Sequence, residues 1–211
     1  MEIMTKGYKS LNSFFSKSNF IGSYIDFQQI PNFNLPEICF LGRSNVGKSS
    51  LINQLTKNKK LAKTSKTPGR TQSINLFSIN DKIMFVDLPG YGFAKFSEKL
   101  KHQLYKSIEQ YINMRSELKQ ILLLIDGKVG MKQGDFETIS FLCQVDVPFI
   151  IILTKIDKCS RKILDQNYSK ISAHLKNSSK KTFEIYATSS SSNEGISELQ
   201  KNIYKFIKND F

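Results

Sequence analysis

The sequence predicts a three-layer α/β fold, in which helices cover both faces of a six-stranded, mostly parallel sheet. Segments with apolar residues at helical spacing alternate along the chain with short apolar runs of strand length. Several of these runs, such as 121–125 and 148–153, are apolar throughout, which is typical of parallel strands buried on both faces. Residues 74–79 and 83–87 differ, because the turn Asn80-Asp81 between them predicts an antiparallel hairpin and so one antiparallel edge strand.

The elements of the N-terminal half follow from local patterns. Residues 23–27 are a candidate short strand, and the apolar run 38–41 is the first core strand. A helix is predicted over 48–57, where the apolar residues fall on one side. Residues 61–73 show no period, and Pro68-Gly69 breaks any helix, so we expect a mobile loop there.

The C-terminal half continues the alternation of helices and strands. Residues 97–114 carry apolar residues at helical spacing, and Ser97 is suited to be the N-cap of that helix. Further helices are predicted at 133–144 and 161–176, and the last strand at 183–187. Gly195 introduces a C-terminal helix with an apolar stripe.

Length and composition indicate one folded domain. A chain of 211 residues suits a single domain, which we place at 23–211, after a partly mobile N-terminal extension at 1–22. No apolar run approaches the length of a membrane-spanning helix, so no span is predicted. The three cysteines, Cys39, Cys143 and Cys159, lack metal-ligand spacing and fit a reducing, cytoplasmic location.

The net charge of +13, from 31 basic and 18 acidic residues, is unusual for this length. It favours a polyanionic partner, which is RNA or a membrane surface. No basic amphipathic helix at either end of the sequence favours the membrane. The alternative is a lysine-rich surface without a polyanionic partner.

A glycine-rich loop follows the first core strand, with the sequence Gly42-Arg43-Ser44-Asn45-Val46-Gly47-Lys48-Ser49, and Ser50 continues into the next helix. The pattern G-x-x-x-x-G-K-[ST] between a strand and a helix predicts a phosphate-binding P-loop. Its backbone N–H groups and the N-terminus of the helix would face the phosphates. Lys48 would reach the β- and γ-phosphates, and the Ser49 hydroxyl would be a ligand of Mg²⁺.

A second motif, Asp87-Leu88-Pro89-Gly90, follows the predicted strand 83–87. Alone it indicates a turn, but after a P-loop it predicts a carboxylate that holds Mg²⁺ through water and a Gly90 N–H that meets the γ-phosphate. A further Mg²⁺ ligand is expected from the loop 61–73. We predict Thr71, in the run Gly69-Arg70-Thr71, over Thr64 and Thr67; the alternative is an ordinary surface threonine.

The run Thr154-Lys155-Ile156-Asp157 predicts the base that is bound. A carboxylate at Asp157 would accept hydrogen bonds from guanine N1–H and the 2-amino group, which adenine lacks. Lys155 would lie over the base and support the P-loop, and the alternative reading of Asp157 is a helix N-cap. Thr188-Ser189-Ser190 could offer backbone N–H groups to the guanine O6, with Ser191 and Ser192 leaving the register open.

Together these residues resemble the EngB family of bacterial ribosome-assembly GTPases, in the Ras-like P-loop GTPase superfamily. The resemblance rests on 35–53, on Lys-Thr-Pro-Gly-Arg-Thr-Gln at 66–72, and on Asp-Leu-Pro-Gly-Tyr-Gly-Phe-Ala-Lys at 87–95. Thr154 to Asp157 and Ser189-Ser190 also match. Asp126-Gly127-Lys128 departs from the family's usual Asp-Ser-Arg.

The resemblance implies a Ras-like fold, binding of GTP and GDP, and slow GTP hydrolysis with Mg²⁺. It also implies a molecular switch in assembly of the large ribosomal subunit, from rRNA and ribosomal proteins, and a link to cell division and septation. A cytoplasmic monomer is expected. Two rivals from other classes are a P-loop nucleotide or small-molecule kinase and an RNA-binding module with a vestigial nucleotide site.

One position predicts how catalysis differs from that of Ras-type enzymes. These place a glutamine after D-x-x-G to orient the attacking water, whereas this chain has Tyr91. The residues expected to act in hydrolysis are therefore Lys48, Thr71, Gly90 and Asn45. Asn45 resembles a P-loop asparagine that coordinates a potassium ion in related GTPases; alternatively, ribosomal RNA or protein orders the loops 61–73 and 90–96.

Overall fold

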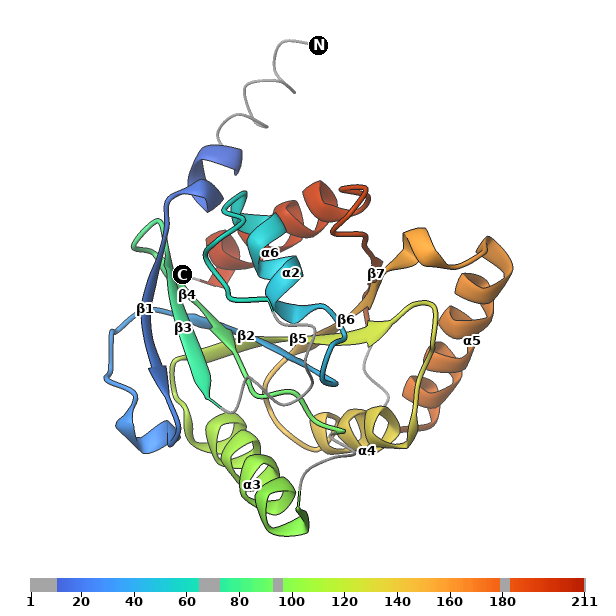
Figure 1. Ribbon diagram of the computed structural model, residues 1–211, viewed down its shortest axis with the longest axis horizontal. Coiled ribbons are helices and arrows are strands. Elements are labelled where there is room, and N and C mark those ends of the chain that lie inside the picture. The colour runs from blue at the N-terminus through green and yellow to red at the C-terminus, as the bar shows by residue number, and fades with distance from the viewer. Residues whose placement is uncertain (1–10, 65–72, 93–96, 179–182, 211) are drawn as a thin grey trace.

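The computed structural model describes residues 11–64, 73–92, 97–178 and 183–210 (Figure 1). Seven strands form one sheet in the order β1-β3-β4-β2-β5-β6-β7. The strands are β1 (Ser18–Tyr24), β2 (Glu37–Gly42), β3 (Ile74–Ile79), β4 (Ile83–Asp87), β5 (Leu118–Asp126), β6 (Phe149–Thr154) and β7 (Ile185–Ala187). The helices are α2 (Lys48–Thr56), α3 (Glu98–Met114), α4 (Gln133–Leu142), α5 (Arg161–Ser178) and α6 (Ile196–Asp210), with 3-10 turns η1 (Phe27–Gln29) and η2 (Ile156–Lys158).

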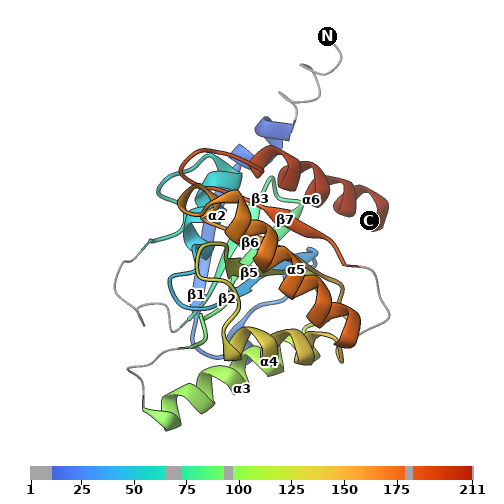
Figure 2. The same ribbon diagram turned by 90° about the vertical axis from the view of Figure 1, so that its right-hand side faces the viewer.

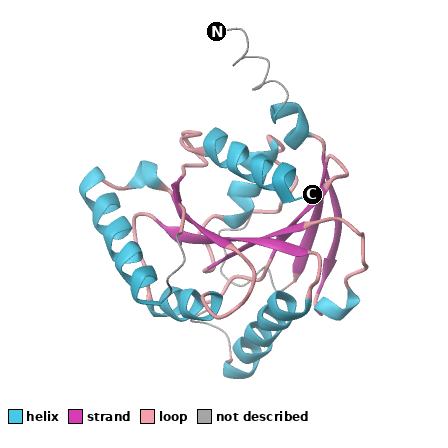
Figure 3. Cartoon of the chain, turned by 180° about the vertical axis from the view of Figure 1, so that it is seen from behind, coloured by secondary structure: helices cyan, strands magenta, loops and turns pink. Residues whose placement is uncertain are grey.

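The predicted three-layer α/β fold is confirmed, with helices on both faces of the sheet (Figures 1 and 2). On one face, α2 and α6 cover Phe40, Phe85 and Leu122. On the other face, α3, α4 and α5 cover a second layer of side chains that includes Leu41 and Leu123. The strands β2 and β5 are buried on both faces, as expected for strands at the centre of the sheet. The view from behind shows helices on both sides of the sheet (Figure 3).

The predicted strand count of six is wrong, because β1 adds a seventh strand beside β3. The antiparallel strand β3 is therefore second from the edge rather than at it. The sequence of β1 lacks the alternation of buried and exposed residues that predicts a strand. Phe20 and Ile21 are both exposed, and the register shifts between Phe20 and Gly22. The short strand predicted at 23–27 is displaced toward the N-terminus, and Asp26 instead caps η1 through Gln28 N–H at 3.0 Å.

Residues before β1 also contribute to the core. Residues 11–16 are helical, and Phe15 is fully buried, with its ring centroid 6.2 Å from that of Phe85. Phe14 makes an edge contact with Tyr204 of α6 at 5.2 Å. The sheet thus includes residues 18–22, which lie on the extension side of the predicted domain boundary, and that boundary stays a prediction.

The hairpin between β3 and β4 formed as predicted, since Asn80 and Asp81 both adopt left-handed φ angles of 52° and 51°. Two such residues make a turn whose twist matches paired strands. Strands β4, β2, β5, β6 and β7 run parallel, so their carboxyl ends meet at one edge of the sheet, where ligands bind in folds of this kind. None of the helices in the described part of the chain is long and apolar enough to cross a membrane.

Candidate functional site

The loop between β2 and α2 has the backbone of a phosphate cradle. Gly47 has a φ of 115° and Asn45 one of 61°, so the chain curls in left-handed steps before helix α2 begins at Lys48. The Thr154 hydroxyl, at the end of β6, donates to the Val46 carbonyl at 2.7 Å and holds the loop from the neighbouring strand. The sequence-predicted loop is therefore anchored on the carboxyl edge of the sheet.

Lys48 lies inside this cradle, 8% exposed, with Nζ 3.5 Å from the Gly42 carbonyl. Burial lowers the pKa of Lys48, and the nearby charge of Asp87 opposes that shift. Burial likewise raises the pKa of Asp87, against the effects of Lys48 and of the Ser49 hydroxyl. The opposite charges of Lys48 and Asp87 stabilise each other in a buried environment. Buried charged groups of this kind are typical of sites that bind a charged ligand.

Two of the three residues predicted to hold Mg²⁺, Ser49 and Asp87, lie side by side, and one carboxylate oxygen of Asp87 is without a hydrogen-bond partner among the described residues. Ser49 at the start of α2 donates to Asp87 Oδ2 at 3.1 Å. The second carboxylate oxygen, Asp87 Oδ1, is buried and has no hydrogen-bond partner among the described residues. A buried, unpartnered carboxylate oxygen beside a hydroxyl fits a hard cation that takes oxygen ligands. The third predicted ligand, Thr71, lies outside the described residues, as do Gly69 and Arg70.

The D-x-x-G loop packs directly on the P-loop. Leu88 N–H donates to the Phe40 carbonyl at 3.2 Å, and Leu88 and Pro89 are buried. A Cβ on Gly90 would lie 2.9 Å from Ser44 Cα and 3.2 Å from Lys48 Nζ, so only glycine fits this approach. The loop is thus close enough to the P-loop to share a ligand with it.

The segment predicted to read the base contacts the P-loop as well. Lys155 adopts a left-handed φ of 58°, and its Nζ donates to the Asn45 carbonyl and to Asp126 Oδ2, each at 2.7 Å. Ile156 is buried beneath this turn. The Asp157 carboxylate is exposed, and a hydrogen bond from the Ser189 hydroxyl at 2.6 Å lowers the pKa of Asp157. Asp157 is therefore held as an oriented anion at the surface.

The amides of Thr188, Ser189 and Ser190 divide into two groups. Thr188 N–H donates to the Leu153 carbonyl at 2.7 Å, and Ser189 N–H donates to the Glu194 carbonyl at 3.0 Å. Within the described part of the chain, the Ser190 N–H has no such partner. If these residues face the guanine O6, Ser190 is thus the amide that remains available.

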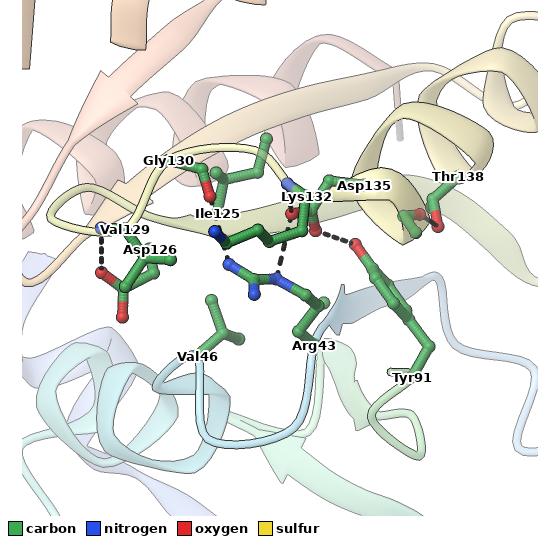
Figure 4. Close-up of polar contacts among 12 residues, drawn as sticks. Arg43, Val46, Tyr91, Ile125, Asp126, Val129, Gly130, Lys132, Asp135 and Thr138 are labelled. Carbon is green, nitrogen blue, oxygen red and sulfur yellow. Dashed lines mark hydrogen bonds and ion pairs between the residues drawn. The ribbon is translucent and has the colours of Figure 1, made fainter. Parts of the chain in front are cut away.

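Two carboxylates that were not among the predicted site residues lie beside this site. Asp126 ends β5 and pairs with Lys155, and Asp135 of α4 pairs with Arg43 Nε at 3.0 Å (Figure 4). Asp126 could have been found, because it ends an apolar strand as Asp87 does. Asp135 carries no comparable signal, since it lies inside a predicted helix.

The fold and this site define a P-loop nucleotide-binding protein, with the phosphate loop, the Asp87 carboxylate and the turn 154–157 at one edge of the sheet. A family model described as a 50S ribosome-binding GTPase matches residues 37–155. A probable GTP-binding protein EngB of Rickettsia bellii is 44% identical over 193 residues, which are 91% of this chain and 89% of that protein. Its counterpart in Thermotoga petrophila is 44% identical over 173 residues, 82% of this chain and 87% of that protein.

Solved structures agree on the fold. A crystal structure of a probable GTP-binding protein EngB is 24% identical and has a TM-score of 0.67, covering 82% of this chain and 99% of that one. Era in complex with MgGDPNP and nucleotides 1506–1542 of 16S ribosomal RNA is 26% identical with a TM-score of 0.64, covering 82% of this chain and 56% of that one. This chain belongs to the EngB family of GTP-binding proteins, and it is a GTPase.

Proposed function

We propose that this GTPase is a molecular switch that acts in assembly of the large ribosomal subunit. The observation that supports the switch is the close approach of Gly90 to Ser44 and Lys48, because a γ-phosphate bound by Lys48 would then lie within reach of the D-x-x-G loop. A loop in contact with the terminal phosphate is held in the triphosphate state and released after hydrolysis. The description of the matched family model, a 50S ribosome-binding GTPase, supports the ribosomal role.

The phosphates and the metal would be held by residues of the P-loop and the D-x-x-G loop. Lys48 supplies a positive charge to the β- and γ-phosphates, while Ser49, Asp87 and Thr71 supply oxygen atoms for Mg²⁺. When bound, Mg²⁺ neutralises charge that develops on the phosphate oxygens. The buried oxygen of Asp87 without a partner supports this assignment.

Guanine would be recognised by Asp157 and by the Ser190 amide. The bond from Ser189 fixes the orientation of the Asp157 carboxylate, which would accept hydrogen bonds from the base. Lys155, held by Asn45 and Asp126, links this base-reading turn to the P-loop. Base recognition and phosphate binding are therefore supported by the same contacts.

We expect slow intrinsic hydrolysis, because Tyr91 cannot orient water as a glutamine does. Its hydroxyl donates to Asp135 at 2.8 Å, and the side chain is 3% exposed. Rate acceleration would then come from a potassium ion at Asn45, whose side chain lies at the exposed rim of the P-loop, or from a ribosomal partner that orders the loops beside it.

The charge distribution supports an RNA partner. No acidic residue occurs between Glu37 and Asp81, a stretch that contains Lys57, Lys59 and Lys60. These three lysines are exposed just after the C-terminal end of α2. We propose a cytoplasmic monomer that binds rRNA and ribosomal proteins of the large subunit, and whose loss impairs cell division and septation.

Sedimentation with purified 50S particles tests the proposal. With a non-hydrolysable GTP analogue, the wild-type protein should move with the particles, and with GDP it should remain at the top of the gradient. Lys48→Ala serves as the control that lacks nucleotide binding and should remain at the top in both cases. Equal association of wild type with both nucleotides would contradict a switch, and no association with 50S particles in either state would contradict the ribosomal role.

A further inference from the structure

A buried cluster of three side chains joins the P-loop, the D-x-x-G loop and helix α4 (Figure 4). The Tyr91 hydroxyl donates to Asp135 Oδ1 at 2.8 Å, and Arg43 Nε forms an ion pair with Asp135 Oδ2 at 3.0 Å. Asp135 is fully buried and Tyr91 nearly so. Buried groups of this kind are costly when one partner is removed, so the three side chains act together.

The proton of this cluster stays on Tyr91. Burial, then the charge of Asp135, raises the pKa of Tyr91 well above its ordinary value. Burial also raises the pKa of Asp135, while bonds from Lys132 N–H, Tyr91 and Arg43 oppose that rise. The raised pKa of Tyr91 thus favours the protonated hydroxyl that donates to Asp135.

The cluster also fixes the start of helix α4. Lys132 N–H donates to Asp135 Oδ2 at 2.8 Å, which caps the helix, and Arg43 Nη2 donates to the Gly130 carbonyl at 3.2 Å. Figure 4 shows Arg43 reaching from the P-loop to both positions. A displacement of Tyr91 or Arg43 would thus be transmitted to the loop before α4 and to its first turn.

The backbone of Tyr91 is bound to the P-loop at the same time. Ser44 N–H donates to the Tyr91 carbonyl at 2.9 Å, and Tyr91 N–H donates to the Gly42 carbonyl at 3.3 Å. Gly90 directly precedes this clamped residue. The position of Gly90 relative to Lys48 is consequently set by Tyr91, and the side chain of Tyr91 is set by Asp135.

We propose that Asp135 and Tyr91 are positioning residues of the nucleotide switch, which preorganise Gly90 for the γ-phosphate and couple the phosphate site to the start of α4. The proposal rests on the proposed switch role of Gly90. Because the contact proposed for Gly90 is with the γ-phosphate, which a diphosphate lacks, the restraint would contribute to binding of the triphosphate alone. By linkage, the triphosphate must in turn stabilise the cluster and the first turn of α4.

The chain contains a second cluster of the same chemistry that serves as a matched control. The Tyr111 hydroxyl donates to Glu37 Oε2 at 2.5 Å, and Arg115 Nη2 pairs with Glu37 Oε1 at 2.6 Å. Tyr111 and Glu37 are both fully buried. Because Glu37 begins β2, this cluster lies at the amino ends of the strands, away from the P-loop.

Calorimetric titration with GTPγS and GDP, both with Mg²⁺, tests the proposal on Tyr91→Phe, Asp135→Asn and Tyr111→Phe. Thermal unfolding of each variant confirms that it is folded. We expect Tyr91→Phe and Asp135→Asn to lose about fivefold or more in affinity for GTPγS, with less than about twofold change for GDP. Tyr111→Phe should lower the melting temperature and leave both affinities within about twofold of wild type.

Hydrogen exchange provides a second readout that a purely structural role would not move. In the wild type, GTPγS should protect residues 128–136 more than GDP does, and this difference should vanish in Tyr91→Phe. The proposal would be overturned if Tyr91→Phe and Asp135→Asn lost affinity equally for GTPγS and GDP, or if they bound GTPγS more tightly than the wild type. The same change in the ratio of the two affinities in Tyr111→Phe would also overturn it. Gly90→Ala tests the switch role separately. If Gly90→Ala binds GTPγS and GDP with the same affinities as the wild type, the proposed switch role fails independently of Asp135.

Discussion

At the scale of single residues, Ser49 and Ser50 offer a test of the metal site. Both serines stand in the first turn of α2, but only Ser49 contacts Asp87. Ser49→Ala should weaken GTP binding in Mg²⁺ by about tenfold or more, since losing even an outer partner of a metal site costs about 10- to 100-fold. Fluorescent GTP titration measures this effect.

The same titration in EDTA isolates the metal. Without Mg²⁺, wild type and Ser49→Ala should bind GTP alike, because the serine then has no ligand to supply. Ser50→Ala, which is exposed, should match wild type in both buffers. A tenfold defect of Ser49→Ala that persists in EDTA would place this serine outside the metal site.

Asp157 is the residue on which we propose that base selectivity depends. Asp157→Asn should reverse the hydrogen-bond pattern, weaken GTP by about 10- to 100-fold and improve binding of xanthosine triphosphate. Competition between the two triphosphates for a fluorescent nucleotide measures the ratio. Asp165→Asn on the exposed face of α5 is the control, and guanine selectivity that is retained in Asp157→Asn would refute the base-reading role.

Asn45 is the residue with which the proposed role of potassium in hydrolysis can be tested. Its side chain is exposed, and its carbonyl is held by Lys155 at 2.7 Å. If a potassium ion stabilises the transition state, hydrolysis should be about tenfold faster in potassium than in sodium, and Asn45→Ala should lose that difference. Phosphate release at matched ionic strength is the measurement. Equal rates in the two salts would eliminate the ion as an activator.

At the scale of elements, the turns after β5 and β6 are joined by Asp126 and Lys155. Burial raises the pKa of Asp126, but the bond from Lys155 and the Val129 and Lys128 amides outweigh it, and the net pKa is lowered. A carboxyl whose pKa is lower in the folded state stabilises the fold above its unfolded pKa, near 3.8, and loses that contribution as the pH falls through the folded value.

Asp126→Asn should therefore destabilise the protein at pH 7 and matter less in acid. We expect a loss of about 1 kcal/mol at pH 7, a modest figure because Lys155 is one-third exposed. Urea unfolding between pH 7 and pH 3.5 should show the difference from wild type shrinking below about pH 4. A difference that is constant over this range would mean that the carboxylate charge is not what stabilises the turn.

The same scale shows what a sequence can predict. Helix α3 begins at Glu98 with Ser97 as its N-cap, because a hydroxyl before an apolar repeat is a local signal. The core strands also matched to within a few residues, since fully apolar runs mark buried parallel strands. Strand β1 was missed because its exposed Phe20 and Ile21 give no alternation, and an edge strand is fixed by its partner rather than by its own pattern.

The site was predictable only where chemistry follows a fixed spacing. The P-loop, Asp87 and Asp157 could be found because each motif lies at a strand end. The contact between Tyr91 and Asp135 joins positions that are 44 residues apart, and no local period connects them. Only the packing of α4 on one face of the sheet brings these two side chains together.

At the scale of the whole molecule, the net charge of +13 would favour binding to the proposed RNA partner. Such binding weakens with salt in proportion to the number of phosphates that are neutralised. Lys60 and Lys63 line a concavity together with Asn75 and Asp87, so these lysines lie beside the proposed switch. Lysines of α5 lie on the opposite side of the sheet, among the helices of the other face.

Two triple variants with equal charge therefore separate local from global attraction. Lys59→Gln/Lys60→Gln/Lys63→Gln should reduce the slope of log affinity for 50S particles against log salt by about two to three, since each lost phosphate contact removes about one. Lys162→Gln/Lys170→Gln/Lys176→Gln should leave the slope nearly unchanged. Filter binding at several potassium chloride concentrations measures both. Equal reductions in the two variants would mean that the charge acts only through the overall field, and that the surface beside the switch is not where RNA binds.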